Sequence, residues 1–287
     1  MTFKTRFAPS PTGPLHLGHA YSAILAYDMA VQNAGSFELR IEDIDQSRAR
    51  AKWTNQIFDD LEWLGLVWPE PIVFQSQRMA IYQTQLDHLW ECQLMFPCDC
   101  NRKDILEATN APQEGLPLLG PDGVIYPGTC QSKPRRANQS RPKDVALRLD
   151  IQSCDVGNIQ FSEMGSGPNG EMGLIHMSHA EMVRDIGAIV LARKDMGTSY
   201  HLSVVLDDAA MGITHIVRGQ DLFEATKIHV LLQQLLDLPT PTYHHHTLIR
   251  DENGKRLAKR DDARAIAKYR ADGYTPDDIR KMVGLVR

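Results

Sequence analysis

The sequence predicts an α/β fold built on a parallel sheet. Short apolar segments alternate with longer segments of helical spacing near the N-terminus, and this texture returns after about residue 176. Strands that alternate with helices run parallel through right-handed crossovers, and ligands then bind at the carboxyl ends of the strands. A chain of 287 residues with 43% hydrophobic content can bury a core large enough for such a sheet.

The N-terminal half of the sheet is predicted from alternating strand and helix patterns. Gly35 is the expected C-terminal stop of the first helix, and Ser47 is the expected N-cap of the second. The expected elements are, in order, a strand over 5–8, a helix over 18–33, a strand over 37–45, and helices over 47–64 and 77–94.

The middle of the chain differs, because Pro, Gly and Asn are frequent and periodicity is poor from about residue 96 to 173. We interpret this part as an insertion into the α/β fold. The elements expected after it are strands over 186–191, 204–206 and 214–217, a helix over 222–238, a short run after Pro241 and two small helices. The predicted division is a first half of the sheet domain over 1–95, an insertion over 96–175, a second half over 176–245, and a charged loop with a short helical tail over 246–287.

Composition excludes several classes of protein. The net charge of −5 argues against binding to nucleic acid by bulk electrostatics, although a local basic face remains compatible with it. No segment approaches the roughly 20 apolar residues of a membrane span, and the N-terminus lacks the apolar region of a signal peptide. We therefore expect a cytoplasmic protein without a membrane partner, acting as a monomer.

The loop from Arg6 to His19 is the most informative segment, since it places two histidines three residues apart at the start of a helix. A helix N-terminus offers unpaired N–H groups and a partial positive charge, and imidazoles at i and i+3 share one face. His16 and His19 could therefore hold phosphates. For two histidines taken alone, an ordinary strand-to-helix loop with a capping histidine is the competing interpretation.

A second loop, Gly254-Lys-Arg256-Leu-Ala258-Lys259-Arg, combines a glycine with several cations. Such a loop can close over phosphates and neutralise charge that develops in a transition state. Taken alone, a solvated charged turn explains the same residues.

Five cysteines in an otherwise ordinary composition indicate a metal site better than a disulfide scaffold, because their number is odd. Cys98, Cys100 and Cys130 fall within the loop-rich insertion, where a structural zinc ion would stabilise a small core. Three cysteines need a fourth ligand, and a histidine, an aspartate or water could supply it. Three buried free cysteines, or a site that has lost its metal, are the alternatives. Cys92 and Cys154 have no partner by spacing and are expected in the core.

Two further segments have weaker patterns. Residues 133–148 hold six cations and one acid, which suits either contact with a phosphate backbone or a mobile solvated loop. The run His244-His-His246 is expected to be structural or close to a nucleotide, because adjacent side chains of a strand point to opposite sides.

Taken together, these segments resemble a known enzyme family. His16-Leu-Gly-His19 is similar to the HIGH signature of class I aminoacyl-tRNA synthetases, and residues 6–13 resemble the form found in the glutamate-activating branch. Residues 256–260 are similar to the KMSKS motif of that family. Arg256 replaces its first lysine and Ala258 its serine, whereas Lys259 keeps the critical position. Arg256 can still neutralise phosphate, with a different geometry.

The resemblance implies a Rossmann-like catalytic domain with an inserted zinc-binding, acceptor-type subdomain, and it implies the site residues. Catalytic roles are implied for His16, Gly18, His19 and Lys259, and ATP binding, with Mg²⁺, for His16, His19, Arg256 and Lys259. Glutamate binding is implied for Arg6, Ala8, Ser10, Glu42, Tyr200 and Arg218. The zinc ligands implied by the family are Cys98, Cys100, Tyr126 and Cys130.

The family resemblance also implies an ATP-dependent ligase that activates L-glutamate as glutamyl-adenylate. The chain ends at Arg287, soon after Lys259, which leaves no room for the large helical anticodon-binding region of an ordinary member. Truncated paralogues in this branch transfer glutamate to queuosine in the anticodon of tRNA(Asp), and we expect that reaction here. The alternatives are a reduced glutamyl- or glutaminyl-tRNA synthetase that charges the 3′ end, and a non-catalytic RNA-binding relic.

Overall fold

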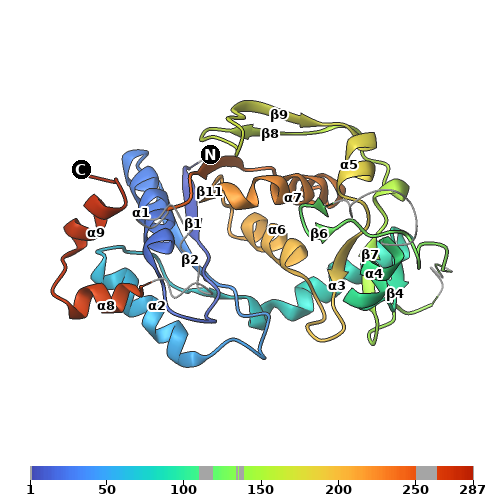
Figure 1. Ribbon diagram of the computed structural model, residues 1–287, viewed down its shortest axis with the longest axis horizontal. Coiled ribbons are helices and arrows are strands. Elements are labelled where there is room, and N and C mark those ends of the chain that lie inside the picture. The colour runs from blue at the N-terminus through green and yellow to red at the C-terminus, as the bar shows by residue number, and fades with distance from the viewer. Residues whose placement is uncertain (1, 110–118, 134, 136–138, 250–263, 287) are drawn as a thin grey trace.

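The computed structural model describes residues 2–109, 119–133, 135, 139–249 and 264–286. The N-terminal half is a parallel sheet, as predicted, and Figure 1 shows it on one side of the molecule. Its elements are β1 (Lys4–Phe7), α1 (Leu17–Gln32), β2 (Ser36–Ile41), α2 (Ala51–Trp63), β3 (Val73–Phe74), a 3₁₀ turn (Gln75–Arg78) and α3 (Met79–Glu91).

The second half of the fold continues this sheet. The peptide N–H of Thr214, just before β11, donates to the Lys4 carbonyl at 3.0 Å, so β11 lies beside β1. β11 pairs in parallel with β12, and β12 with β8, while β9 closes the edge antiparallel to β8. The elements are β8 (Ile159–Glu163), β9 (Gly173–Met177), α5 (His179–Asp185), α6 (Tyr200–Ala210), β11 (His215–Gly219), a 3₁₀ turn (Gln220–Leu222), α7 (Phe223–Leu235) and β12 (Thr242–His246).

A second, antiparallel sheet lies at the opposite end of the molecule, beyond α6 and α7 (Figure 1). The predicted insertion supplies most of it. Its strands are β4 (Met95–Cys98), β7 (Ala146–Leu149) and β10 (Ile189–Ala192). This part of the chain also holds α4 (Arg102–Thr109), a 3₁₀ turn (Ile151–Ser153) and a separate hairpin of β5 (Leu119–Gly120) and β6 (Gly123–Val124). β8 also falls in the predicted insertion, but it pairs with β12 and not with this antiparallel sheet. The division of the chain at residue 175, between the insertion and the second half of the sheet domain, stays a prediction.

The C-terminal tail forms two short helices, α8 (Ile266–Ala271) and α9 (Pro276–Met282), which lie near α1 and α2 (Figure 1). Thr275 caps α9, and Arg280 reaches back to Asp28 of α1 at 2.6 Å and 2.9 Å. The tail thereby covers the helical side of the N-terminal half.

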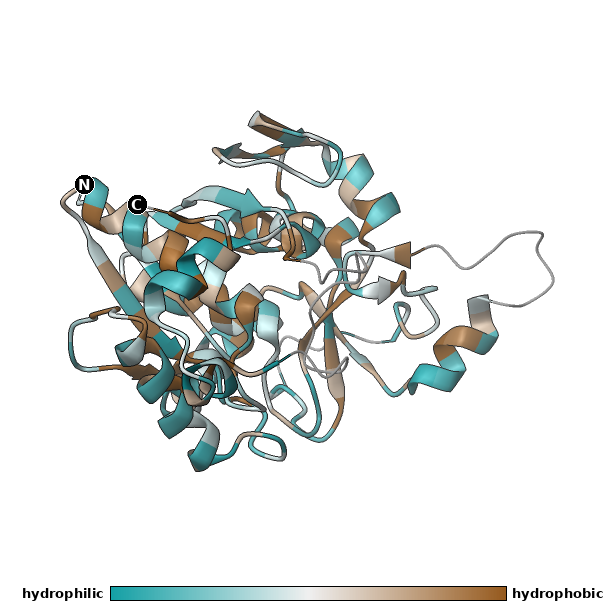
Figure 2. Cartoon of the chain, turned by 60° about the vertical axis from the view of Figure 1, so that its left-hand side comes forward, coloured by the Kyte–Doolittle hydropathy of each residue, from teal (hydrophilic) through white to brown (hydrophobic). Residues whose placement is uncertain are grey.

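The hydrophobic residues form two large cores and one small one. One large core joins β1 and β2 to α1, α2, α8 and α9, and the other joins α3, α6 and α7 to the strands of the second half. The helices carry both hydrophobic and hydrophilic residues (Figure 2), as expected for helices that pack on one side only. The small core, under the insertion, consists of Phe96, Cys98, Tyr126 and Cys130.

Several sequence predictions were wrong in detail. Residues 204–206, expected as a strand, lie inside α6, where every side chain from 201 to 208 is buried, so the sequence there shows no helical period. Ser47 is not an N-cap, because α2 begins later, after Arg50. Cys92 is exposed at the end of α3, whereas Cys154 is buried as expected. Within the described part of the chain, no helix is both long and apolar enough to cross a membrane.

Candidate active site

A cavity of about 460 Å³, which we call the smaller cavity, opens at the carboxyl ends of β1, β2 and β11. This is where the strand order predicted a ligand. The predicted site residues that line it are Arg6, Ala8, His16, Gly18, His19, Glu42, Tyr200 and Arg218. The loop after β1, the residue after β2, the end of β11 and the start of α6 therefore converge on one space.

His16 and His19 meet at the mouth of this cavity through the first turn of α1. The His16 ring accepts the Gly18 peptide N–H through Nδ1 at 3.1 Å, and the His19 ring accepts the His16 N–H through Nδ1 at 3.1 Å. Since both Nδ1 atoms are acceptors, a neutral ring carries its proton on Nε2. In that tautomer each Nε2–H is a hydrogen-bond donor, and contact of these donors with phosphates stays a prediction.

Gly18 lets this arrangement pack closely. A Cβ at this position would lie 3.1 Å from Cε1 and 3.2 Å from Nδ1 of His16, so any other residue would push the His16 ring. The glycine therefore lets the His16 ring lie close to the backbone of the first turn.

Arg6 is held at the floor of the cavity by buried ion pairs. Its Nε donates to Asp208 Oδ1 at 3.1 Å, and Arg40 Nη1 donates to the same oxygen at 2.6 Å. Arg40 Nη2 also donates to Glu42 Oε1 at 3.0 Å. Two guanidinium groups and two carboxylates thus alternate in a buried network whose charges balance.

The network affects its two acids differently. Burial alone would raise the pKa of Asp208, but Arg40 and Arg6 lower it, so this carboxylate stays charged. For Glu42, burial outweighs the attraction of Arg40 and raises the pKa. A cationic group beside Glu42 would favour its charged form, which suits this residue to bind an ammonium.

Arg218, by contrast, contacts only neutral groups. Its Nε donates to His245 at 3.2 Å, Nη1 to His229 at 3.0 Å, and Nη2 to the hydroxyl of Thr226. The guanidinium is buried and lines the cavity, so a negative charge is the partner it lacks among the described residues. These contacts make Arg218 an anion-binding group.

The predicted ATP ligands Arg256 and Lys259 lie outside the described residues. Described residues on either side of them lie at the site. Ile249 lines the smaller cavity, and Ala265 pairs with His16 as an isolated bridge. The described residues that flank 250–263 therefore lie close to the histidines.

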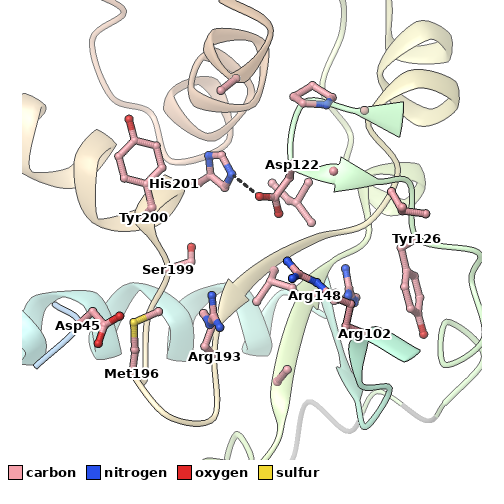
Figure 3. A pocket seen from close by; sticks show the side chains of 18 of the residues that line it. Asp45, Arg102, Asp122, Tyr126, Arg148, Arg193, Met196, Ser199, Tyr200 and His201 are labelled. Atoms are coloured by element: carbon pink, nitrogen blue, oxygen red, sulfur yellow. Dashed lines mark ion pairs between the residues drawn. The ribbon is translucent and has the colours of Figure 1, made fainter. Parts of the chain in front are cut away.

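A larger cavity, of about 960 Å³, adjoins the smaller one (Figure 3). Glu42 and Tyr200 line both cavities, so the two spaces meet at these side chains. Ser10, predicted to contact glutamate, lines the larger cavity and not the smaller one. The larger cavity lies between the parallel sheet and the insertion, and its cationic lining residues are Arg48, Arg102, Arg148, Arg193 and Lys194.

The predicted metal ligands also meet. The Sγ atoms of Cys98, Cys100 and Cys130 lie within 4.8 Å of one another. Tyr126 Oη lies 3.4 Å from the Sγ atoms of Cys98 and Cys100, and the Sγ atoms of Cys100 and Cys130 are 3.5 Å apart. Sulfur and oxygen ligands of a tetrahedral zinc ion are about 3.5–3.8 Å apart. We call these four residues the cysteine cluster, and their spacing fits a tetrahedral metal.

The surroundings of the cysteine cluster favour thiolate at Cys130, whereas burial raises the pKa of Cys100. Burial would raise the pKa of Cys130, but hydrogen bonds from Tyr126 and the backbone contribute to lowering it to about 7. Arg148 Nε donates to Cys98 Sγ at 3.3 Å, and its guanidinium lies 4.0 Å from the centre of the Tyr126 ring. Burial and the thiols raise the pKa of Tyr126, so this phenol keeps its proton unless a metal displaces it.

Sequence reasoning missed the buried residues behind the site. Asp208, Arg40 and His229 lie in strands or helices where an uninterrupted buried run hides any pattern. Their signal is chemical: an acid, a guanidinium and an imidazole in apolar runs each need a partner. His246, part of the histidine run, lines the smaller cavity and contacts Ser22 at 2.7 Å, close to the predicted nucleotide position.

Comparison with known proteins places this geometry in context. The family model described as "tRNA synthetases class I (E and Q), catalytic domain" matches residues 2–286. A glutamyl-Q tRNA(Asp) synthetase from Rhodobacter capsulatus is 57% identical over 98% of this chain and 99% of its own length. One from Symbiobacterium thermophilum is 37% identical over 96% of this chain and 83% of its own length.

A solved structure agrees with these matches. The glutamate tRNA ligase from Elizabethkingia meningosepticum, in complex with its amino acid, superposes with a TM-score of 0.76 and 25% identity. The match covers 99% of this chain and 61% of that one. The class I glutamate-type fold therefore extends over the whole of the described chain.

Proposed function

This chain belongs to the catalytic-domain family of the class I tRNA synthetases for glutamate and glutamine, and on that premise we propose that it is a glutamate-activating ligase. In our proposal it converts L-glutamate and ATP to glutamyl-adenylate, then transfers glutamate to queuosine in the anticodon of tRNA(Asp). The observation that carries the proposal is the pair of cavities that meet at Glu42 and Tyr200.

Glutamate suits the smaller cavity by charge. The substrate carries two carboxylates and one ammonium group, and the cavity presents the guanidinium groups of Arg6 and Arg218 with the carboxylates of Glu42 and Asp221. Arg218, which contacts no acid among its described partners, would bind one carboxylate, and Glu42 would bind the ammonium. Arg6, already paired with Asp208, would lie within reach of the other carboxylate. Tyr200 would close the side that faces the larger cavity.

The first step needs charge stabilisation more than covalent help. An oxygen of the glutamate α-carboxylate attacks the α-phosphorus of ATP, the bond to the bridging oxygen breaks, and pyrophosphate leaves. The Nε2–H groups of His16 and His19 would donate to phosphate oxygens, with Lys259, Arg256 and a Mg²⁺ ion bound to ATP neutralising further charge. Positioning at the start of α1 adds the partial positive charge of the helix.

The second step would use the larger cavity. A hydroxyl of the queuosine cyclopentene-diol attacks the carbonyl carbon of glutamyl-adenylate, AMP leaves with the bonding electrons, and the hydroxyl proton passes to the phosphate of the departing AMP. The hydroxyl must reach the carbonyl where the two cavities meet, beside Glu42 and Tyr200. Arg48, Arg193 and Lys194 would contact phosphates of the anticodon loop from the wall of the same cavity.

We propose zinc for the cysteine cluster, because three thiolates with a phenolate and tetrahedral spacing suit that ion. The ion would be structural, holding β4 to the segment around Cys130 where the apolar core is small. That the protein acts as a monomer in the cytoplasm, with no membrane partner, stays a prediction from the sequence.

The proposal is tested by offering labelled glutamate and ATP to tRNA(Asp) with queuosine, tRNA(Asp) without it, and tRNA(Glu). We expect labelling of the first substrate only. Prior treatment with periodate, which cleaves free diols, should abolish that labelling.

Labelling of tRNA(Glu) at its 3′ end alone would refute the proposed acceptor and favour a reduced glutamyl-tRNA synthetase. Labelling of none of the three, together with no glutamate-dependent ATP–pyrophosphate exchange, would refute a glutamate-activating ligase altogether.

A further inference from the structure

Behind the smaller cavity, a buried row of side chains runs from Arg218 to the β5–β6 hairpin. Arg218 Nη1 lies 3.0 Å from His229 Nδ1, and His229 Nε2 lies 3.1 Å from His201 Nδ1. His201 Nε2 then lies 3.5 Å from a carboxylate oxygen of Asp122, the contact drawn as a dashed line in Figure 3. We call this row the histidine relay.

The proton positions along the histidine relay follow from its first member. A guanidinium can only donate, so His229 Nδ1 must be an unprotonated acceptor. The neutral His229 ring then carries its proton on Nε2 and donates to His201 Nδ1. His201 in turn carries its proton on Nε2, facing Asp122. Every hydrogen bond therefore points the same way, from the cavity toward the hairpin.

Burial supports this assignment. The His229 and His201 side chains are almost completely buried, in α7 and α6 respectively. Burial and the charge of Arg218 lower the pKa of His229 well below its usual value, so the ring stays neutral. Both rings also pack edge-on against Tyr200, at centroid distances of 5.4 Å and 5.5 Å.

We propose that His229 is a positioning residue for glutamate, and that His201 supports it by accepting the Nε2–H of the tautomer that Arg218 selects. This inference rests on the proposed function and deepens it. A guanidinium has five N–H groups, and His229, Thr226 and His245 take three of those of Arg218. Two remain for a substrate carboxylate, and the acceptor at His229 decides how the group is turned toward the cavity.

The histidine relay explains why a buried cation is held by neutral groups. An acid in the place of His229 would compete with the substrate carboxylate, as Asp208 already occupies Arg6. A neutral acceptor orients Arg218 and leaves its charge for the ligand. Asp122, which is half exposed at the wall of the larger cavity, links the end of the relay to the space proposed for the acceptor nucleoside.

Two substitutions at position 229 separate hydrogen bonding from packing. His229→Leu keeps the volume but removes both nitrogens, whereas His229→Gln offers an oxygen acceptor and an N–H donor on one amide. In glutamate-dependent ATP–pyrophosphate exchange, we expect His229→Leu to raise the KM for glutamate at least about tenfold, with the KM for ATP within about twofold. His229→Gln should return the KM for glutamate to within about threefold of the unmodified protein.

The control is His176→Gln, on the exposed face of β9, which should change neither KM. Equal KM values for glutamate in the leucine and glutamine variants, or an unchanged KM in the leucine variant, would overturn the positioning role. His201→Phe should raise the same KM by a smaller factor, since it removes the acceptor for the His229 Nε2–H.

A second measurement does not depend on catalysis or on the variants folding. In protein labelled with ¹⁵N at histidine, the His229 ring should show an unprotonated Nδ1 and a protonated Nε2, and L-glutamate should shift these resonances. The opposite tautomer, or a charged ring, would overturn the relay. The expected tautomer and shift without any exchange activity would support the relay while refuting the proposed activation, so the two failures are distinguishable.

Discussion

The smaller cavity and the cysteine cluster both bury polar side chains, but they balance them in different ways. At the cavity, Asp208 lies between Arg6 and Arg40, so the charges of the floor are paired within the protein itself. In the cysteine cluster, three sulfurs and a phenol crowd together with a small apolar core around them. The first arrangement is complete before any ligand arrives, whereas the second fits a metal ion.

We infer from this difference that the smaller cavity and the cysteine cluster have different roles. A floor whose charges are already paired can hold reacting groups rigidly, which is what catalysis by positioning requires. A subdomain that depends on a metal for its stability can supply a wall for a large substrate without taking part in the chemistry. Substitutions in the two regions should therefore have separable effects.

The largest effect is expected from Asp208→Asn. This change leaves two buried guanidinium groups with Glu42 as their one directly paired carboxylate among the described residues, since Asp207 acts on Arg40 without an ion-pair contact. Breaking a buried pair costs about 3–5 kcal/mol. We expect that loss in the free energy of unfolding, measured with urea, and a fall of at least about a hundredfold in glutamate-dependent exchange, because Arg6 loses its position.

A matched control lies on β2, the strand that also carries Arg40. Glu38→Gln breaks the partly exposed pair with Lys4, at 3.2 Å, and should cost less than about 1 kcal/mol. A similar loss in both variants would contradict the view that the cavity floor depends on its buried pairs.

A smaller effect is expected from His19→Ala. Losing one donor to a developing charge costs about 2.7–4 kcal/mol, so single-turnover adenylate formation should slow at least about tenfold. His19 also accepts the His16 N–H, so a shift of His16 should disturb the pair. Gly18→Ala crowds the His16 ring and should therefore slow the same step although His19 is intact. An unchanged rate in the alanine variant at 19 would show that this ring only caps the helix.

Removal of the metal should sharpen the comparison further. We expect about one zinc per chain, bound by the cysteine cluster, and its loss after Cys100→Ser or chelation. Exchange should change by less than about threefold, whereas the thermal stability of the insertion and transfer to tRNA should fall. Cys92→Ser, at an exposed thiol, should keep its zinc. Loss of exchange on chelation would show that the two regions are not separable.

The smallest effect concerns the buried carboxyl group of Asp60 in α2, whose charge Gln56 and Arg270 compensate only in part. Burial raises the pKa of Asp60 from 3.8 to about 6, and one of its oxygens has no hydrogen-bond partner among the described residues. Between these two pH values the folded protein holds a proton that the unfolded chain has released, so stability falls as pH rises through that window.

Asp60→Asn removes the titrating carboxyl group and with it this pH-dependent loss of stability. The variant should be more stable than the parent by about 1–2 kcal/mol above pH 6, with the difference vanishing below pH 4, in urea unfolding at several pH values. Exchange should not change, because Asp60 lies in α2, away from both cavities. A variant less stable at every pH would mean that the carboxylate is compensated after all.

Much of the site could be predicted because its residues follow directly after strands or begin helices. Glu42 comes at the end of β2 and His16 before α1, and the carboxyl ends of parallel strands meet at one edge. Cys98, Cys100 and Cys130 were likewise predicted from their spacing in a loop-rich segment, and the structure brings them together.

What could not be predicted depends on tertiary contacts. The fully buried helix α6 has no polar face, so residues 204–206 look like a strand and His201 and Asp208 look like isolated polar residues. Their roles become visible only when α7 brings His229, and β1 brings Arg6, into contact with them. The position of Ser10 also depends on tertiary structure, because this residue of the turn after β1 lines the larger cavity and not the smaller one.

The central claim is that the smaller cavity activates glutamate. It is tested most directly by ATP–pyrophosphate exchange with folded, metal-loaded protein and L-glutamate, L-glutamine or L-aspartate as the amino acid. We predict exchange that depends on glutamate and is much weaker with the other two, because only glutamate combines the second carboxylate with the length of this site. No exchange with any of the three, or equal exchange with glutamine, would contradict the account.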